Sequence, residues 1–460
     1  MRLISIVVFL TIVLPVYAQN QADRIESMKS FASSMTNIEP ESFKDHELEF
    51  LKNAIGDKRI VFLGENSHVD GSTLRAKSKV IKYLHEEMGF DFLLIEKGFY
   101  ETDRAWRDLL AKRDEPLSVF ANLMDIFRVF ISLHEKNLYE YIGEQAFTDA
   151  PLRIGGIDII ESSTSYAWGE SVDLKTILDD IYGDEWPNEI VKQYKIAIKT
   201  YDIAKGEIPV GFGQKKIESN LFFISEFERF LKNNEKIASD RKELILFMIQ
   251  ALKSGNKWQY WGANKPKRRK TKGQVLADYF TLRDKYMAEN LIWYLERYPE
   301  KKVIVSTSTY HISRNVQNIE PRPKMLGNDA VPMGHYVWNQ YGDDIYSIAF
   351  VSYKGHFGSS KRNVKVKKIP KRKKGGIEHV MHLAGIKFGF LDLRTLPEEM
   401  GWVKNAYLNP TFLDSYKTDW SRIYDGLFFI DEMRPDESFG YVPNFNRPPP
   451  YLPAGAGSVH

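Results

Sequence analysis

The 460-residue sequence contains no cysteine. It therefore cannot form a disulfide, use a thiolate nucleophile or carry a lipid on an N-terminal cysteine. It also lacks a strong excess of one charge, because 64 Lys and Arg residues oppose 61 Asp and Glu residues, for a formal net charge of +3. A nearly neutral chain of this size gives no indication of a polyanionic partner, and we expect no nucleic-acid ligand.

Long apolar runs are missing after residue 18, so no later segment is predicted to cross a bilayer. Residues 1–18 are different. Arg2 precedes an apolar run that ends at Val16, and Val16 and Ala18 occupy the −3 and −1 positions of a cleavage site. The run of about 14 residues is shorter than the roughly 20 that a spanning helix needs. This pattern predicts a signal peptide cleaved after Ala18, and a mature chain exported to the periplasm or beyond without a stable membrane anchor.

Several familiar catalytic motifs are also absent. The sequence has no Gly-x-Ser-x-Gly elbow, no His-Glu-x-x-His, no P-loop and no Gly-x-Gly-x-x-Gly after a predicted strand. These absences argue against a serine nucleophile of the α/β-hydrolase type, a zincin and the common nucleotide-binding sites.

Short apolar runs alternate with helical patterns along the rest of the chain. Residues 59–63 and 90–96 are typical of buried strands, and residues 72–88 between them have the spacing of an amphipathic helix. Further strands are predicted at 153–159, 302–306, 346–353, 388–393 and 426–431. Because a βαβ unit makes its strands parallel, we predict an α/β fold with a mostly parallel central sheet flanked by helices, and a large helical insertion or cap between the first and later strands.

The predicted organisation follows from these patterns. After the signal peptide at 1–18 we expect a helical lead-in at 19–57, the first half of the α/β core at 58–160, a mainly helical insertion at 161–300, the second half of the core at 301–435 and a Pro- and Gly-rich tail at 436–460. Two basic runs, Lys265–Lys272 and Lys354–Lys374, are predicted to be exposed loops. Such loops can contact an anionic surface.

Glutamate and histidine residues stand at the ends of three predicted strands. Glu65 and His68 follow the first strand, Glu96 ends the second, and His311 follows the strand at 302–306. The carboxyl ends of parallel strands meet at one edge of a sheet, so we expect these four side chains to lie together. A histidine there can accept a proton from water while a carboxylate orients it. The same four groups can equally hold a divalent metal, and a non-catalytic binding cleft is the third possibility that the residues leave open.

Four stretches of the chain carry a family pattern. They are VFLGENSHVDGSTLRAKSKVIKYLHEEMGFDFLLIEKGFYETD, in which the Gly-Glu-x-x-His motif lies near the start, and the later VIVSTSTYHISRN, VPMGHYVWNQYGDDIYSIAF and IEHVMHLAGIKFGFLDLR. Together these stretches resemble the erythromycin esterase family. The resemblance covers most of the chain from about residue 58 to 432. It implies a hydrolase that activates water, without a cofactor, to cleave a small-molecule ester or lactone, and it leaves the substrate open.

The resemblance also implies roles for individual residues. His68 would be the general base, Glu65 or Glu96 would orient it or the water, and His311 would stabilise the oxyanion or bind substrate. Lys77 aligns with an active-site arginine of the family. Further candidates for substrate binding are Ser308, which stands where some members have a histidine, His335 in a matching stretch, and Arg75, two positions before Lys77.

Overall fold

The fold is seen in a computed structural model of the chain. It describes residues 21–44, 46–111, 132–159, 169–192, 194–195, 214–235, 237–263, 272–320, 330–359, 364–410 and 415–437. The predicted signal peptide, residues 265–271 of the first basic run and the tail beyond residue 437 lie outside the described residues. No helix in the described ranges is both long enough and apolar enough to span a bilayer.

Within the described residues, nine strands form one sheet in the order β1-β8-β11-β6-β2-β5-β3-β4, and β7 pairs with β6 outside this path. The strands are β1 (Ser33–Met35), β2 (Ile60–Glu65), β3 (Phe92–Gly98), β4 (Arg153–Asp158), β5 (Val303–Ser308), β6 (Ile345–Ser359), β7 (Val364–Lys368), β8 (Phe388–Asp392) and β11 (Gly426–Met433). The neighbours from β11 to β4 are all parallel, whereas β8 and β1 are added antiparallel at one side. The predicted mostly parallel central sheet is therefore confirmed.

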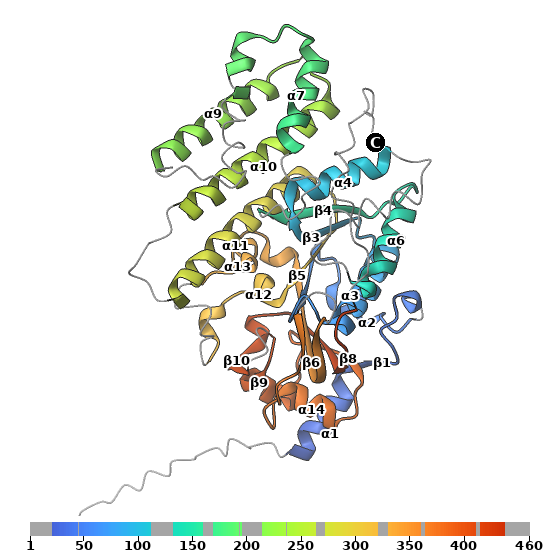
Figure 1. The fold of residues 1–460 in the computed structure, drawn as a ribbon. Helices are drawn as coiled ribbons and strands as arrows, with labels where there is room; N and C mark the ends of the chain where they lie inside the picture. The colour runs from blue at the N-terminus through green and yellow to red at the C-terminus, as the bar shows by residue number, and fades with distance from the viewer. Residues whose placement is uncertain are drawn as a thin grey trace, which may run out of the picture.

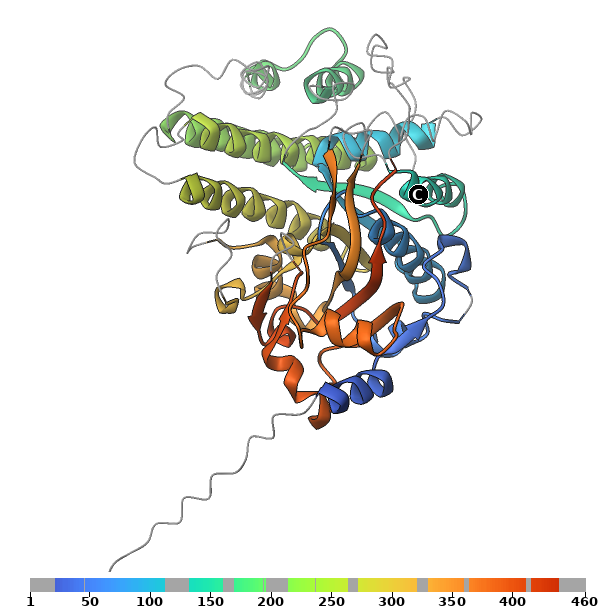
Figure 2. The same cartoon turned by 60° about the horizontal axis from the view of Figure 1, so that its bottom comes forward.

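Helices flank this sheet and extend beyond it at one end (Figure 1). They are α1 (Gln21–Phe31), α2 (Phe50–Ile55), α3 (Gly71–Met88), α4 (Phe99–Ala111), α6 (Lys136–Gln145), α7 (Gly169–Tyr182), α9 (Gln214–Lys232), α10 (Ser239–Ala263), α11 (Lys272–Arg297), α12 (Thr309–Ile312), α13 (Met333–Tyr341) and α14 (Ile377–Leu383). Short 3₁₀ helices cover Pro40–Ser42, Leu133–Glu135, Val316–Asn318, Gly342–Asp344, Glu398–Asn405 and Trp420–Arg422, and β9 (Ala406–Leu408) pairs with β10 (Tyr416–Thr418). Figure 2 shows the long helices α10 and α11 on one side of the sheet and α3 and α6 on the other.

Each face of the sheet has its own hydrophobic core. In β2 the side chains of Ile60 and Phe62 enter one core, together with residues of α10 and α11. Val61 and Leu63 enter the other core, with residues of α2, α3 and α6. Successive side chains of a strand point to opposite faces, so a strand covered on both sides must be apolar at every position. This burial explains why the sequence of β2 is a continuous apolar run.

Two local predictions were wrong. The lead-in is not only helical, because Ser33–Met35 forms strand β1 along β8. Three residues are too few to show a period in sequence, and the pairing partner alone makes this strand. The second basic run is not a plain loop, because β6 continues to Ser359 and β7 returns beside it. The high charge of the run concealed the alternation of Val364 and Val366 with lysine.

Candidate active site

Three neighbouring strands bring the predicted residues together. β5 lies between β2 and β3, and its last residue, Ser308, is opposite Glu65 at the end of β2. Glu96 lies near the end of β3, and His311 lies in the short helix α12 that follows β5. His68 lies in the turn between β2 and α3. The strand order therefore gathers at one sheet edge the groups that are far apart in the sequence.

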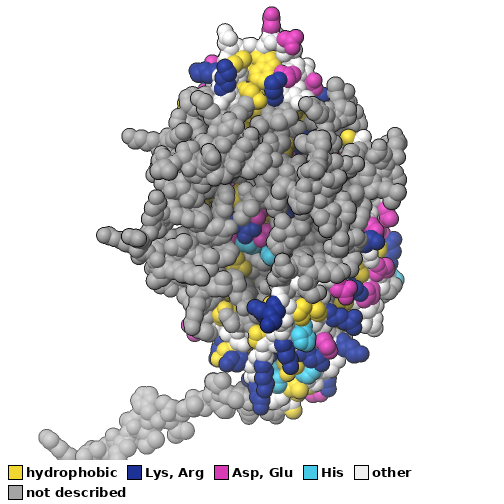
Figure 3. Space-filling view, viewed as in Figure 1, with side chains coloured by type: hydrophobic (Ala, Val, Ile, Leu, Met, Phe, Trp, Pro, Cys, Tyr) yellow, Lys and Arg dark blue, Asp and Glu magenta, His cyan; other side chains and the backbone are white. Residues whose placement is uncertain are grey.

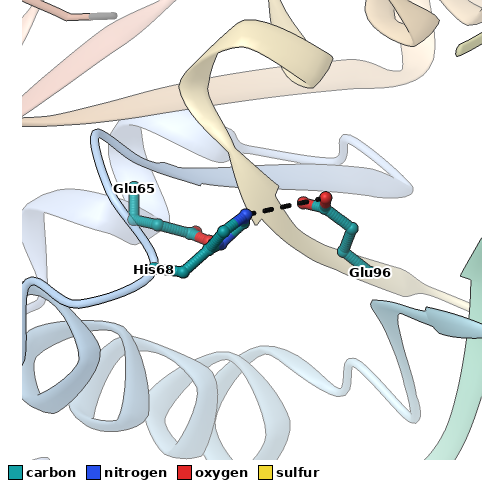
Figure 4. A group of neighbouring side chains, drawn as sticks. All are labelled: Glu65, His68 and Glu96. Atoms are coloured by element: carbon teal, nitrogen blue, oxygen red, sulfur yellow. Dashed lines mark hydrogen bonds and ion pairs between the residues drawn. The ribbon is translucent and has the colours of Figure 1, made fainter. Parts of the chain in front are cut away.

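His68 lies between two glutamates (Figure 4). Its Nδ1 donates a hydrogen bond to Oε1 of Glu65 at 2.8 Å, and its Nε2 faces Oε1 of Glu96 at 3.7 Å. The second oxygen of Glu65 accepts a hydrogen bond from Nζ of Lys77, which is buried in α3. The side chain of His68 is 41% exposed, whereas that of Glu65 is 6% exposed. His68 can thus exchange a proton with solvent or substrate while a buried ion pair fixes its ring.

Glu96 is the centre of a second group of charges. Its Oε1 lies 2.8 Å from Nη2 of Arg283 and 3.2 Å from Nε2 of His311. Its Oε2 accepts hydrogen bonds from Oγ1 of Thr307 at 2.5 Å and from the backbone N–H of Ser308 at 3.3 Å. A carboxylate with this many donors is held in one orientation and remains ionised.

His311 is almost entirely buried, with 4% of its side chain exposed. Its Nδ1 lies 2.7 Å from Oδ1 of Asp284, and the same oxygen accepts a hydrogen bond from the backbone N–H of Met333 at 2.8 Å. The ring of His311 therefore lies between two carboxylates, Asp284 on its Nδ1 side and Glu96 on its Nε2 side. This arrangement favours the doubly protonated imidazolium, which can donate to both.

Arg283 completes the group from helix α11. It donates through Nε to Oδ1 of Asp158 at 3.1 Å and through Nη2 to Oδ2 of the same carboxylate. Asp158 is the last residue of β4, the strand next to β3. This two-pronged contact holds the guanidinium over the sheet edge, where its Nη1 lies 3.3 Å from Nε2 of His311.

The pKa values follow from burial and neighbouring charge. Burial by itself raises the pKa of Glu65, but the positive charges of Lys77 and His68 outweigh it and bring it down to about 2. Burial by itself lowers the pKa of both histidines. The charges of Glu96 and Glu65 outweigh burial for His68 and raise its pKa above 6.5. Asp284 and Glu96 raise the pKa of His311 to about 10. At neutral pH His311 is therefore protonated and positively charged.

The formal charges of the cluster explain these directions. The cluster contains four carboxylates and two side chains, Lys77 and Arg283, that stay positive. It is therefore neutral when both histidines are protonated and each adds one positive charge. The cluster comprises Glu65, Glu96, Asp158, Asp284, Lys77, Arg283, His68 and His311. When His68 loses its proton, the cluster carries one net negative charge. The electrostatic free energy of this uncompensated charge is the reason that the pKa of His68 is raised.

Asp70, at the end of the turn that carries His68, is a further buried acid. It is 1% exposed, and its Oδ1 has no hydrogen-bond partner among the described residues. Burial raises its pKa to about 7, with a further contribution from the charge of Glu65 and an opposing one from Arg372. A second group therefore titrates near neutral pH beside the site.

The turn is held from outside by two segments of backbone. The carbonyl of Val69 accepts hydrogen bonds from the N–H groups of Gly358 and Asp436, both at 3.2 Å. Arg434 N–H donates to Oγ of Ser72 at 2.9 Å, and Ser72 N–H donates to the carbonyl of Arg434 at 3.4 Å. The turn that positions His68 is thus anchored to the end of β6 and to the residues that follow β11.

Of the four remaining candidate residues, two contact the cluster and two lie away from it. Lys77 lies in the cluster through Glu65, and Ser308 contacts it through its backbone N–H. Arg75 points elsewhere, to Glu39 at 2.7 Å. His335 lies on α13, with its Nε2 3.3 Å from Nδ2 of Asn339, and no contact with the cluster is seen within the described ranges. Among the residues that the structure describes, neither Arg75 nor His335 contacts the cluster around Glu96.

Three residues of the site were not predicted. Asp158 could have been found, because it is the next-to-last residue of the predicted strand at 153–159 and Glu96 is the last residue of the one at 90–96. Arg283 and Asp284 lie inside a long helix of the insertion, where charged residues are common and nothing local marks them. Only the packing of α11 against β4 and α13 brings these two residues to the sheet edge.

Glu65, His68 and Glu96 also satisfy the simplest geometric condition for a metal site, since one donor atom from each lies within 4.8 Å of the others. The two carboxylates, however, already face cations. Glu65 pairs with Lys77, and Glu96 pairs with Arg283 and His311. A divalent ion between them would lie close to these positive charges, so the donor set fits a metal less well than it fits a proton on His68.

Comparisons with known proteins agree with this fold. The chain is 25% identical over 444 residues to the putative hydrolase YbfO of Bacillus subtilis (strain 168), a match that covers 89% of this chain and 95% of that protein. It is 24% identical over 425 residues to the erythromycin esterase type II of Escherichia coli, covering 84% of this chain and 92% of that one.

Solved structures show the same architecture. A protein from Bacillus cereus superposes with a TM-score of 0.69 at 18% identity, covering 91% of this chain and 99% of that chain. A mutant of the erythromycin esterase EreC in its open conformation gives a TM-score of 0.60 at 16% identity, covering 88% and 98%. The model of the erythromycin esterase family matches residues 85–433, which include Glu96, Arg283 and His311 and follow His68. The chain belongs to the erythromycin esterase family.

Proposed function

We propose that this member of the family is an exported hydrolase that cleaves an ester or lactone with water activated by His68. The observation that carries the proposal is the orientation of this one imidazole. Glu65 accepts a hydrogen bond from its Nδ1–H, so its Nε2 is the atom that can accept a proton, and the side chain is partly exposed. A carboxylate that fixes the tautomer in this way is the arrangement that a histidine base needs.

The chemistry can be followed from this geometry. Nε2 of His68 takes a proton from a water molecule, and the water oxygen forms a bond to the carbonyl carbon of the ester. As the proton moves, His68 becomes an imidazolium, and its positive charge lies beside the negative charge that develops on the carbonyl oxygen. Arg283 and His311 hold Glu96 in place on the far side of His68. The bond to the alkoxide then breaks, and the imidazolium of His68 returns its proton to the leaving oxygen. The products are a carboxylic acid and an alcohol.

Support for the reaction class comes from the family and from the names of two relatives, a putative hydrolase and an erythromycin esterase. The E. coli relative is an erythromycin esterase, so macrolide lactones belong on the substrate panel. The proposal of export rests on the pattern of residues 1–18 alone.

A metal-dependent hydrolase is the second candidate, favoured by the short distances among Glu65, His68 and Glu96. It predicts that activity disappears in chelator and returns with an added divalent ion. The ion pairs of both carboxylates with Lys77, Arg283 and His311 support the metal-free alternative.

The test is a hydrolysis assay of the purified protein with macrolides, simple esters and lactones, with and without chelator. The His68→Ala variant is measured beside it, and His335→Ala is the matched control on a histidine outside the cluster. We expect turnover that survives chelator and His335→Ala but not His68→Ala. Equal turnover by His68→Ala and the parent protein would end the proposed role of His68, and loss in chelator would establish the metal-dependent candidate. If no compound is turned over while one is bound tightly, the chain is a non-catalytic binding protein.

A further inference from the structure

The basic run Lys354–Lys374 forms an arm on the outside of the sheet. It contains ten Lys and Arg residues and no acid. Its first part is the end of β6, and β7 returns antiparallel to it, with His356 opposite Lys368 and Phe357 opposite Lys367. Of the strands described, only β6 pairs with β7, so β7 is an edge strand. We use the name basic arm for residues 364–374.

Six lysines of the basic arm are exposed, and none has a carboxylate within ion-pair distance among the described residues. They are Lys365, Lys367, Lys368, Lys371, Lys373 and Lys374. The other two described basic residues of the run behave differently. Lys354 pairs with Asp431 and Glu432, and Arg372 is buried beside Glu378. The uncompensated charge is therefore confined to the arm.

Protection of a sheet edge explains only part of this charge. Lysines on an edge strand prevent another strand from pairing with it, and Lys365, Lys367 and Lys368 can do this. Lys371, Lys373 and Lys374 lie after the strand has ended, where there is no edge to protect. The positive surface continues further, since Nζ of Lys373 and Nζ of Lys417 each lie 5.9 Å from the centre of the Tyr407 ring. Figure 3 shows basic and histidine side chains together over the lower part of the molecule.

An apolar residue lies among these lysines. Val366 is 38% exposed, one of the few large hydrophobic side chains with this exposure in the described chain. Because side chains alternate along a strand, Val366 shares its face of β7 with Lys368, whereas Lys365 and Lys367 point to the other face. A soluble polyanion needs only the charges. A bilayer with anionic headgroups offers charge at its surface and an apolar boundary just beneath it, which matches an exposed valine and an exposed lysine on the same face of β7.

From this arrangement we infer that the basic arm is a docking surface for a bilayer that contains anionic phospholipids. Each lysine near such a surface gains from its negative potential, and clusters of four to eight basic residues are the usual sequence feature of this binding. The interaction is peripheral and reversible, because it combines a few charges with one small apolar contact and does not involve a spanning helix.

Docking through the arm would also orient the active site. Gly358 at the end of β6 donates to the carbonyl of Val69, the residue that follows His68. Gly358 has a φ of +113°, and a Cβ at this position would lie 2.7 Å from the carbonyl oxygen of Lys365. The start of the arm and the catalytic turn are therefore joined by a tight backbone contact, and a bilayer that holds one also fixes the direction of the other.

The test is co-sedimentation of the full protein with vesicles of phosphatidylcholine alone or with about one third phosphatidylglycerol, at low salt and at about 0.5 M salt. The arm variant carries Lys365→Gln, Lys367→Gln, Lys368→Gln and Lys371→Gln. The matched control carries the same substitution at Lys29, Lys136, Lys175 and Lys192, which are exposed and paired with glutamate or aspartate, so both variants have the same net charge. A third variant, Val366→Ser, removes the apolar contact and keeps every charge.

We expect binding to anionic vesicles only, a loss of at least about tenfold at high salt and in the arm variant, and little change in the control. Val366→Ser should weaken binding by a few-fold, and hydrolysis of a soluble ester should be the same in all variants. Equal binding by the arm variant and the control would overturn the inference. So would binding to soluble polyphosphate without binding to anionic vesicles, which would show a site for a different class of polyanion.

Discussion

The two histidines of the proposed active site lie in opposite surroundings although both contact Glu96. The side chain of His68 is 41% exposed and lies on a turn, and its second partner, Glu65, is neutralised by Lys77. The side chain of His311 is 4% exposed and lies between Asp284 and Glu96, with Arg283 beside it. The same residue type therefore has access to solvent in one place and is enclosed by charge in the other.

This difference separates the tasks that the two residues can perform. A base must gain and lose a proton during each turnover, which requires access to water or substrate and a pKa not far from the working pH. His68 has this access, and the charges of Glu96 and Glu65 raise its pKa above 6.5. His311 has a pKa raised to about 10 and no comparable exposure, so it remains a cation that adds fixed positive charge to the site. The different roles expected of His68 and His311 therefore follow from their burial and neighbouring charges, because the residue type is the same.

The largest expected effect comes from replacing each histidine by glutamine. His68→Gln should lower kcat/KM by about 10²–10⁴-fold and leave stability nearly unchanged, because it removes the proton acceptor from a partly exposed position. His311→Gln should lower the free energy of unfolding by about 3–5 kcal/mol, because Asp284 and Glu96 lose a buried cation. Steady-state kinetics and urea unfolding measure the two effects.

The opposite pattern of effects in the two histidine variants would contradict these assigned roles. If His311→Gln abolished turnover without a change in stability, and His68→Gln destabilised the fold, the exposed and buried histidines would have exchanged roles. Asp284→Asn is a useful third variant, since it keeps the shape beside His311 and removes only the charge.

Lys77 tests whether the exposed histidine depends on buried charge. Lys77→Met keeps the length of the side chain and leaves Glu65 buried without its strongest cation. We expect a loss of about 3–5 kcal/mol in the free energy of unfolding and a drop in kcat/KM, because Glu65 then takes up a proton more easily and no longer fixes His68. Lys77→Arg, which keeps the charge, should retain most of the stability. A stable and fully active Lys77→Met variant would contradict this account of Glu65.

The dependence on pH sharpens the same comparison. We expect kcat/KM to rise with pH as His68 loses its proton, with an inflection above pH 6.5 because its pKa is raised, and to fall near pH 10 as His311 loses its proton. The stability that His311 contributes should be complete below about pH 6.5 and should be lost as the pH rises through about 10. Asp70→Asn is the control for the acid limb, since Asp70 has a pKa raised to about 7. An acid limb that disappears in Asp70→Asn would move the assignment from His68 to Asp70.

The smallest effects are expected at the two candidates that the structure leaves outside the cluster. Arg75→Gln breaks an ion pair with Glu39 at the surface and should change the free energy of unfolding by about 1 kcal/mol or less. Neither Arg75→Gln nor His335→Ala should change kcat/KM by more than about twofold on any substrate of the panel. A large rise in KM for His335→Ala with kcat unchanged would instead show that His335 binds substrate.

The predicted strands agree well with the observed ones because burial on both faces forces a sequence to be apolar throughout, as in β2 and β3. The predicted grouping of Glu65, His68, Glu96 and His311 is what a parallel sheet gives to residues at the ends of neighbouring strands. Short or charged elements were missed. β1 exists only through its pairing with β8, and the lysines of β7 concealed its two valines.

The choice between Lys77 and Arg75 is a second example of what the sequence can predict and what it cannot. Both lie on α3, and both were plausible cations for the site. Two residues along a helix point in very different directions, so only one of them can face the sheet edge. The resemblance to the family selected Lys77, and the structure places it on Glu65.

The sequence alone determined the long apolar strands, their mostly parallel arrangement and the four residues at the ends of three of them, because apolar runs and the connection rules of α/β folds are local properties of the chain. Tertiary structure decided the charges. Arg283 and Asp284 come from a helix in the middle of the chain, and their contacts with Asp158, Glu96 and His311 exist only when α11 packs beside the sheet. Those contacts make His311 a buried cation and leave His68 as the proposed proton acceptor, since a pKa depends on burial and on every charge nearby and not on the order of residues.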